Sequence, residues 1–176
     1  MHLTDYKVTF RQTSELSSDD VSNIFRIKDQ HWKYGIKSQE NWFNNNIDSK
    51  DIHLLIYRGN ELLAYSNLVN IKVTIDGCSL NAFGLGNVCV SIEHSKCGLG
   101  SILVSFANLF LKSRESLGLL LCKNSLISFY EFNKWRVLEC KELIVSGSLS
   151  DSVLMCFNKE TGIAGFPNTI MINRCF

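Results

Sequence analysis

A short glycine-containing loop holds the residues whose types and spacing point most clearly to chemistry. Residues 95–101 read SKCGLGS and lie between the apolar run at 88–92 and a helical pattern. The first N–H groups of a helix are unpaired and carry partial positive charge, so a helix start binds phosphate readily. Gly98 and Gly100 let the main chain approach such an anion. The stretch alone predicts either a phosphate cradle or a purely structural turn.

Two further side chains of the loop, Lys96 and Ser101, add a positive charge and a hydrogen-bond donor. The spacing lacks the third glycine of a dinucleotide fingerprint and the Gly-Lys-Ser/Thr of a P-loop. The acidic ribose contact and the Mg²⁺ ligands of nucleotide-binding proteins are also missing at the expected spacing. Nucleotide binding is therefore the least supported use of this loop.

Hydrophobic periodicity and turn residues predict the elements that position the loop. In chain order they are an edge strand at 6–10, a helix capped by Ser17 or Ser18, a second helix from near Ser38, a hairpin of 52–58 and 61–75 around Gly59-Asn60, a strand after the Asp76-Gly77 turn, and a central strand at 88–92. A helix from 98, a strand at 117–122, a short helix at 125–133 and final strands at 135–139 and 153–158 complete the order.

The helix after the loop has one apolar face. Its members are Leu99, Ile102, Leu103, Phe106, Ala107, Phe110 and Leu111. A right-handed crossover through this helix makes the strands at 88–92 and 117–122 parallel neighbours in a mixed sheet. Ligands of such sheets bind at the carboxyl ends of the strands, where the glycine loop lies.

Length and composition limit the possible classes of protein. The chain has 176 residues, 45% of them hydrophobic and 20% charged, which fits one globular domain. A net charge of +1 without runs of like charge excludes a large basic field for nucleic acid or an anionic membrane. The polar N-terminus has no apolar signal core, and the apolar run at 99–111 is too short to span a bilayer. We expect a cytoplasmic protein, monomeric or homodimeric, that binds neither nucleic acid nor membrane.

The seven cysteines are scattered without a Cys-x-x-Cys pair, unlike a disulfide framework or a zinc ribbon. We expect most of them to be reduced residues of the core. His94 and Cys97 have a spacing of three, but two ligands without a second pair make a poor metal site, so no metal is expected. Cys97 near a helix start is a minor candidate nucleophile, because no histidine is placed by the sequence to serve it.

Two segments together resemble the GNAT superfamily of acyl-CoA-dependent N-acyltransferases. Residues 84–108, GLGNVCVSIEHSKCGLGSILVSFAN, are similar to its cofactor motif, in which a Val-x-Val strand end is followed by Gln/Arg-x-x-Gly-x-Gly/Ala and a helix. Residues 127–137, ISFYEFNKWRV, are similar to its Phe-Tyr-Glu-x-x-Gly-Phe segment. Ser95 stands where the family usually has Gln or Arg, and Lys134 where it has Gly.

The resemblance implies one acyltransferase domain over 1–176 with an α/β (α+β) fold. Its mixed, mostly antiparallel sheet would have about six to seven strands with a central parallel pair, flanked by about four helices. The cosubstrate would be acetyl-CoA. The residues implied to bind it are Val88, Cys89, Val90, Ser95, Lys96, Cys97, Gly98, Leu99, Gly100, Ser101, Asn124 and Tyr130.

The resemblance also implies roles in catalysis. Main-chain groups of residues 88–90 would pair with the pantetheine arm and polarise the thioester carbonyl. Tyr130 would protonate the departing CoA thiolate. Glu93, with His94, is a candidate relay for the amine proton, although a solvated strand end is an equally good interpretation.

The acceptor pocket of similar enzymes is formed by the first two helices and the loop between the last strands, here about 140–152. Trp32, Tyr34 and Trp42 are therefore candidates to line it. The resemblance favours an N-acetyltransferase that acts on a small-molecule primary amine. The alternative is a GNAT-like module that binds acyl-CoA without catalysis, as a sensor or an assembly part.

Overall fold

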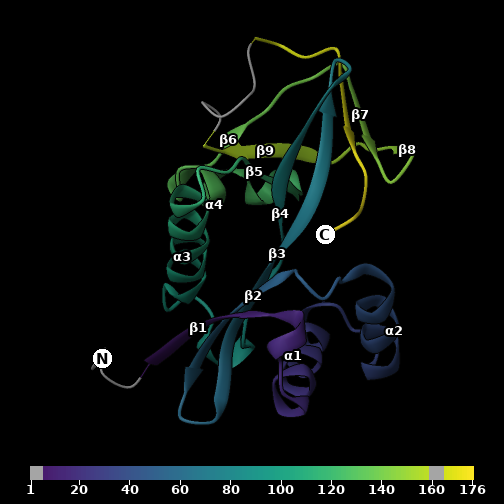
Figure 1. Cartoon of the computed structure of the whole chain (residues 1–176). Helices are drawn as coiled ribbons and strands as arrows, with labels where there is room; N and C mark the ends of the chain where they lie inside the picture. The colour runs from purple at the N-terminus through teal and green to yellow at the C-terminus, as the bar shows by residue number, and fades with distance from the viewer. Residues whose placement is uncertain (1–5, 159–164) are drawn as a thin grey trace. The chain divides into compact units, whose positions relative to one another are not determined.

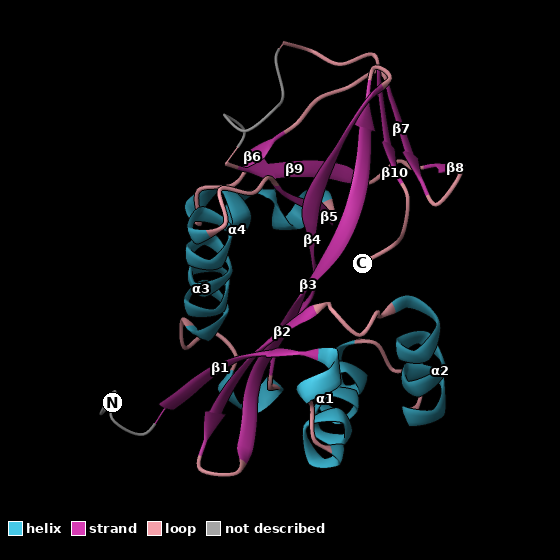
Figure 2. Ribbon diagram, in the orientation of Figure 1, coloured by secondary structure: helices cyan, strands magenta, loops and turns pink. Residues whose placement is uncertain are grey.

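The computed structural model describes residues 6–158 and 165–176, which form helices on a mixed, largely antiparallel sheet (Figures 1 and 2). The α-helices are α1 (Ser18–His31), α2 (Ile36–Asn46), α3 (Leu99–Ser113) and α4 (Ile127–Phe132). Short 3-10 turns are η2 (Thr13–Glu15), η3 (Ile92–His94) and η4 (Asn124–Leu126). The strands are β1 (Tyr6–Gln12), β2 (Ile52–Arg58), β3 (Glu61–Ile75), β4 (Cys78–Val90), β5 (Gly118–Cys122), β6 (Arg136–Val137), β7 (Glu142–Val145), β8 (Ser148–Leu149), β9 (Val153–Phe157) and β10 (Thr169–Ile172).

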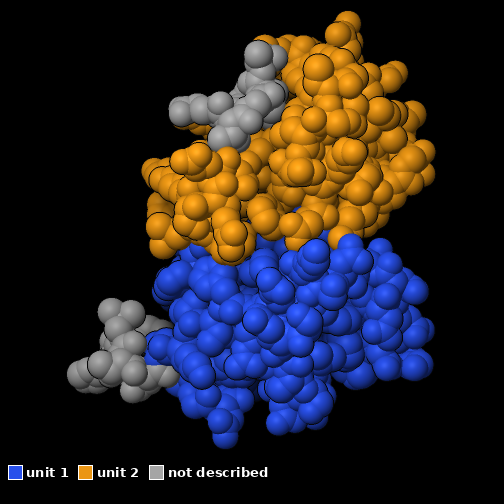
Figure 3. Space-filling view, in the orientation of Figure 1, with its two compact units in different colours: residues 1–69, 87–106 blue, residues 70–86, 107–176 orange. Residues whose placement is uncertain are grey.

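The chain forms two compact units that interleave in sequence (Figure 3). Unit 1 comprises residues 1–69 and 87–106, and unit 2 comprises residues 70–86 and 107–176. The strands β3 and β4 and the helix α3 each contribute residues to both units. The prediction of a single acyltransferase domain stays a prediction.

Unit 1 is built on the antiparallel ladder β1–β2–β3, with Phe10 opposite Leu54 and Leu55 opposite Tyr65. One face of the ladder carries Leu55 and Tyr65, which pack with buried side chains of α1 and α2. On β1, Phe10 meets Phe106 of α3 edge to face, with ring centroids 6.3 Å apart. The ladder of unit 1 is therefore covered by α1 and α2 on one face and contacted by α3 through Phe10.

The first helix begins where the sequence predicts. Ser17 caps α1 by accepting a hydrogen bond from the Asp20 N–H, and the Asp20 carboxylate accepts one from the Ser17 N–H. The second helix begins at Ile36, not near Ser38, because its cap is Gly35, whose N–H donates to Asp29 at the end of α1.

Unit 2 contains the strand order β6-β9-β5-β4-β3-β10-β7-β8. Its central parallel pair is the predicted one, but the paired residues are Phe83 and Gly84 with Gly118 and Leu119. A second parallel pair joins β10 to β7. The predicted sheet class is confirmed.

The strand count of the described residues is ten, rather than six to seven. The two strands expected after the Asp76-Gly77 turn and at 88–92 are one continuous strand, β4. The region 140–152, expected to be a loop, contains β7 and β8, and the C-terminal segment contains β10. These are short strands stabilised by their neighbours in the sheet, which local patterns do not reveal.

Two further expectations have mixed outcomes. All seven cysteines are free thiols, but only Cys89, Cys122 and Cys156 are buried, so the expectation that most belong to the core is wrong. On α3, Ile102 is exposed and Val104 is buried instead. Among the described residues, no helix has both the length and the apolar character that a membrane crossing requires.

Candidate active site

The carboxyl end of β4 directs alternate main-chain groups to opposite sides. The Ser91 N–H donates to the Leu63 carbonyl of β3 at 2.8 Å. The N–H and C=O of one extended residue point the same way, and neighbouring residues alternate. Val88 and Val90 therefore direct their main-chain groups away from β3, whereas Cys89 directs its own toward β3. Of the three residues expected to pair with a pantetheine arm, only Val88 and Val90 therefore direct main-chain groups to the outward edge of β4.

The last turn of α1 docks on this outward edge. The His31 Nε2 lies 2.7 Å from the Val90 carbonyl oxygen, and the Ile92 N–H donates to the Gln30 Oε1 at 2.9 Å. The sequence pattern does not distinguish His31 from the packing aromatics around it. No local signal reveals the contact, because 59 positions separate the bonded residues.

The glycine loop leads from η3 to the first turn of α3. Lys96 has φ 62° and Gly98 has φ 82°, both in the left-handed region, and the space beside Gly98 is open. The Gly98 carbonyl accepts the first helical bond, from Ile102 at 3.1 Å. Ser95 and Cys97 are exposed. An exposed loop that enters a helix start fits the pyrophosphate cradle expected from the sequence.

The candidate relay residues differ in their surroundings. The side chain of Glu93 is exposed. His94 is held by the β2–β3 hairpin, where Arg58 Nη2 lies 3.0 Å from its Nε2 and Arg58 also pairs with Glu61 at 3.2 Å. Because the guanidinium only donates, the His94 Nε2 accepts and is occupied.

The buried ammonium group of Lys28 lies near Cys89 of β4. Lys28 of α1 is 3% exposed, and its Nζ lies 4.0 Å from the centroid of the Trp42 ring. Burial lowers the pKa of Lys28 to about 8, while Cys89 acts in the opposite direction. Burial likewise raises the pKa of the Cys89 thiol to about 12. A thiol that stays protonated is unsuited to act as a nucleophile.

The Lys28→Met variant is expected to raise the free energy of unfolding at pH 7 by about 1–2 kcal/mol. It removes a buried charge, which costs more than the lost contact with Trp42 stabilises. The folded-state pKa of about 8 lies below the ordinary 10.5, so the unfolded chain binds more protons in that window. The full cost of burying the charged Lys28 therefore applies below pH 8 and falls as pH rises toward 10.5. The difference in free energy of unfolding between Lys28→Met and the parent should shrink over the same range.

Urea unfolding at pH 7 and pH 9.5 measures this difference. The exposed Lys33→Met is the matched control and should change stability by no more than about 0.5 kcal/mol. A Lys28→Met protein less stable than the parent at pH 7 would contradict the expectation.

In unit 2, Tyr130 lies on α4 and is 7% exposed. Burial, and then the nearby Cys122, raise the pKa of Tyr130 to about 12. Its hydroxyl therefore keeps its proton at neutral pH. Asn124 begins η4 and is exposed. The remaining predicted cosubstrate residues belong to unit 1.

A family model described as an acetyltransferase (GNAT) domain matches residues 12–135. This match spans more than half of the chain. The chain belongs to the GNAT acetyltransferase family. Membership supports acyl-CoA-dependent acyl transfer in general. Among curated proteins, no sequence match is found.

Solved GNAT structures share the fold. An acyl-CoA N-acyltransferase from Pseudomonas aeruginosa is 15% identical with a TM-score of 0.63, covering 85% of this chain and 98% of its own. YhbS from Escherichia coli, in complex with CoA, is 13% identical with a TM-score of 0.66, covering 94% and 89%. The ribosomal-protein-S18-alanine N-acetyltransferase from Escherichia coli is 15% identical with a TM-score of 0.58, covering 93% and 95%. At these identities the likeness concerns the fold alone.

The backbone at Lys134, where the GNAT pattern has glycine, has the conformation that suits glycine best. Lys134 has φ 72°, the left-handed conformation that glycine adopts most easily. The next residue, Trp135, is 1% exposed, and its Nε1–H donates to the Asn108 Oδ1 at 2.8 Å. The backbone geometry is therefore kept with a lysine, at the cost of local strain.

The predicted acceptor residues of this GNAT protein have unequal surroundings. Trp32 packs against the core of unit 1, and its carbonyl accepts a hydrogen bond from Gln39. Trp42 lies against the Lys28 ammonium. Tyr34 is 73% exposed. All three come from the α1–α2 region.

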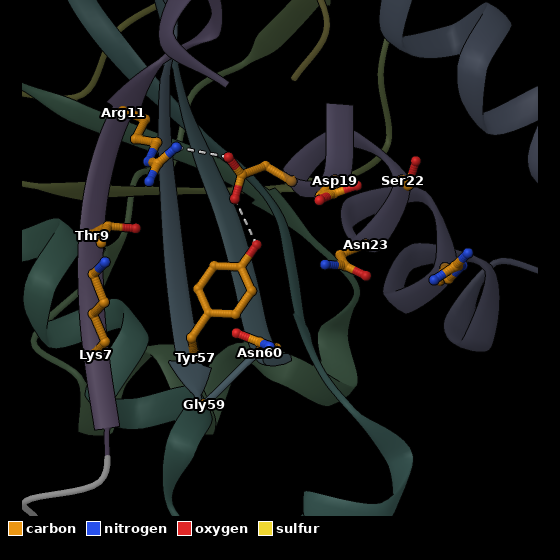
Figure 4. A pocket seen from close by; sticks show the side chains of 11 residues that line it. Lys7, Thr9, Arg11, Asp19, Ser22, Asn23, Tyr57, Gly59 and Asn60 are labelled. Carbon is orange, nitrogen blue, oxygen red and sulfur yellow. Dashed lines mark hydrogen bonds and ion pairs between the residues drawn. The ribbon is translucent and has the colours of Figure 1, made fainter. Parts of the chain in front are cut away.

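A separate polar pocket of about 520 Å³ lies in unit 1 (Figure 4). Its lining residues are Lys7, Thr9, Arg11, Asp19, Asp20, Ser22, Asn23, Arg26, Tyr57, Gly59 and Asn60. The Asp20 carboxylate pairs with Arg11 at 2.8 Å and accepts from the Tyr57 hydroxyl at 2.7 Å. Although burial raises the pKa of Asp20, bonds from Ser17 and Tyr57 and the charge of Arg11 lower it overall. This carboxylate ties the first turn of α1 to β1 and β2.

Proposed function

We propose that this GNAT protein is an acetyl-CoA-dependent N-acetyltransferase that acetylates a primary amine of a small molecule. The observation that carries the proposal is the exposed loop at 95–98, which enters the start of α3 shortly after the outward edge of β4. The amides of that helix start and Lys96 hold the pyrophosphate, with Asn124 as a further contact to the cosubstrate. Membership of the GNAT family supports the choice of an acyl-CoA over other phosphate ligands.

The transfer needs three catalytic contributions from the protein: donors to the thioester oxygen, an acid for the thiolate and a relay for the amine proton. The outward N–H groups of Val88 and Val90 polarise the thioester carbonyl, as expected of preorganised donors at a developing oxyanion. The amine nitrogen forms a bond to the carbonyl carbon, and the carbon–sulfur bond breaks. Tyr130 then donates its proton to the departing thiolate. Glu93 relays the proton released by the amine to solvent.

The acceptor lies against aromatic side chains in this proposal. Trp32, Tyr34 and Trp42 line its pocket, and their apolar faces suit a small organic amine. A related fold serves a protein acceptor in the ribosomal-protein-S18-alanine N-acetyltransferase. A protein α-amine is therefore included among the acceptors to be tested.

Tyr130→Phe should lower turnover about tenfold to a hundredfold, because it removes the proton donor while preserving the buried ring. Turnover is measured under conditions in which chemistry limits the rate, with acetyl-CoA affinity as the companion measurement. The affinity should stay close to that of the parent. Phe129→Leu on the same helix is the matched control for altered packing. Unchanged turnover in Tyr130→Phe would remove this residue from the mechanism.

A thermal-shift panel of acetyl-CoA, CoA, ATP and NAD tests the proposed cosubstrate. A ligand at 100 times its Kd stabilises the folded protein by about 2.7 kcal/mol. Stabilisation by ATP or NAD alone would contradict the proposal. With acetyl-CoA bound, thiol release across an amine library separates the enzyme from the alternative, a non-catalytic acyl-CoA-binding module.

A further inference from the structure

The imidazole of His31 is held in one tautomer by the main chain of β4. Its Nε2 lies 2.7 Å from the Val90 carbonyl oxygen, which can only accept a hydrogen bond. Nε2 must therefore carry a proton. In the neutral ring this leaves the lone pair on Nδ1, so the free side of the ring is a proton acceptor.

The position of the ring connects it to the proposed chemistry. Val90 bears the N–H and the C=O that point away from β3, as the bond of the next residue, Ser91, to Leu63 establishes. In the proposed function this edge polarises the thioester carbonyl. His31 is hydrogen-bonded to the same residue and is exposed to solvent.

Other ionisable groups on the packed elements are engaged elsewhere or exposed. On α1, Lys28 lies against Trp42, and Asp29 accepts from the N–H of Gly35. After β4, Glu93 is exposed and His94 is bonded to Arg58.

Within residues 6–158 and 165–176, the contacts of the His31 ring are the Val90 carbonyl and the Trp32 ring, with centroids 5.9 Å apart. His31 is also the last residue of α1.

We propose that His31 is the general base of the acetyl transfer, a proposal that rests on the proposed function. Nδ1 takes the proton that the acceptor amine loses as its nitrogen forms the new bond to the carbonyl carbon. The carbon–sulfur bond breaks, and Tyr130 supplies the proton of the thiol product. The imidazolium then returns its proton to solvent, with Glu93 as the relay, and Tyr130 takes up a proton from solvent to restore its hydroxyl. The ligand class at Nδ1 is a primary amine that binds with its nitrogen neutral, so that its lone pair can attack and only one proton passes to Nδ1.

The His31→Gln variant tests this role. The glutamine Nε2–H retains a donor for the Val90 carbonyl, but the side chain has no basic nitrogen. We expect kcat/KM for the best amine of the library to fall at least tenfold, with the Kd for acetyl-CoA unchanged. In the parent, kcat/KM should fall as pH is lowered through the range in which imidazoles bind a proton, and the variant should lose this dependence.

Matched variants distinguish His31 from its neighbours. Lys33→Gln, exposed and close in sequence, should keep the parental kcat/KM and pH profile. An acid limb that persists in His31→Gln and disappears in Glu93→Gln or His94→Gln would overturn the assignment. If the parent released thiol with none of the amines of the library, the proposed function and the base would both be overturned. An active parent with an unchanged His31→Gln overturns the base alone.

A spectroscopic measurement tests the tautomer without reference to turnover. In ¹⁵N spectra of the parent imidazoles at pH 8, the signal absent from His31→Gln should have the pattern of an Nε2–H tautomer. The opposite tautomer, Nδ1–H, would overturn the proposal because Nδ1 could not accept a proton.

Discussion

The Gly100→Val protein should bind acetyl-CoA at least about a hundredfold more weakly than the parent while remaining folded. Gly100 is the second residue of α3 and follows the loop that enters the helix. A branched side chain there stands beside the first-turn amides that would hold the pyrophosphate. Losing two hydrogen bonds to a charged group costs about 3 kcal/mol or more, which corresponds to a hundredfold in Kd.

Folding should be little affected by this change. Valine has a better helix propensity than glycine, and the first turn of α3 is only partly buried. Ser105→Val, on an exposed position of the same helix, introduces the same side chain away from the loop and should bind acetyl-CoA like the parent. Calorimetric titration and thermal unfolding of the three proteins separate binding from stability. A well-folded Gly100→Val protein with parental affinity would return the glycine loop to a purely structural turn.

Local signals were sufficient where the chain folds by contacts between near neighbours. Ser17 and Asp20 reveal the start of α1 because the capping pair lies within four residues. The two-residue turns at 59–60 and 76–77 reveal the hairpins for the same reason. The α2 start was misplaced because its glycine cap depends on a carboxylate of the preceding helix.

Distant contacts explain what the sequence could not reveal. The strand β10 pairs with β3, so its partners lie nearly a hundred positions away. Similarly, the bond between His31 and Val90 and the burial of Lys28 beside β4 follow only from the packing of α1. The glycine loop was recognisable because the residues that would hold a pyrophosphate lie in one short stretch. The side chains around β4 were not, because no periodicity distinguishes a histidine that bonds a carbonyl from one that packs.

Acidification should destabilise the folded protein through His53, by about 3 kcal/mol between pH 6.5 and pH 4. His53 is fully buried on β2, and its Nε2 and Nδ1 lie 2.9 Å from the Thr13 and Tyr65 hydroxyls. The Thr13 hydroxyl donates to the Asp48 carbonyl at 2.6 Å, so it accepts from Nε2–H, and Nδ1 accepts from Tyr65. The chain of donors therefore suits only the neutral ring.

Burial, and then the charge of Lys28, lower the pKa of His53 to about 4 from its ordinary 6.5. The unfolded chain binds the proton first, so stability is complete above pH 6.5 and is lost as pH falls toward 4.

Urea unfolding of the parent and of His53→Gln at pH 7, 5.5 and 4.5 isolates this contribution from that of the carboxylates, which both proteins share. The variant should be less stable at pH 7 but lose less stability on acidification, because its side chain does not titrate. Asn41→Gln, which changes an exposed side chain that does not titrate, should retain the parental slope. Equal slopes in the parent and His53→Gln would show that His53 is free to take up its proton in the folded state. In that case the hydrogen bonds of His53 with the Thr13 and Tyr65 hydroxyls would not hold the ring in its neutral form.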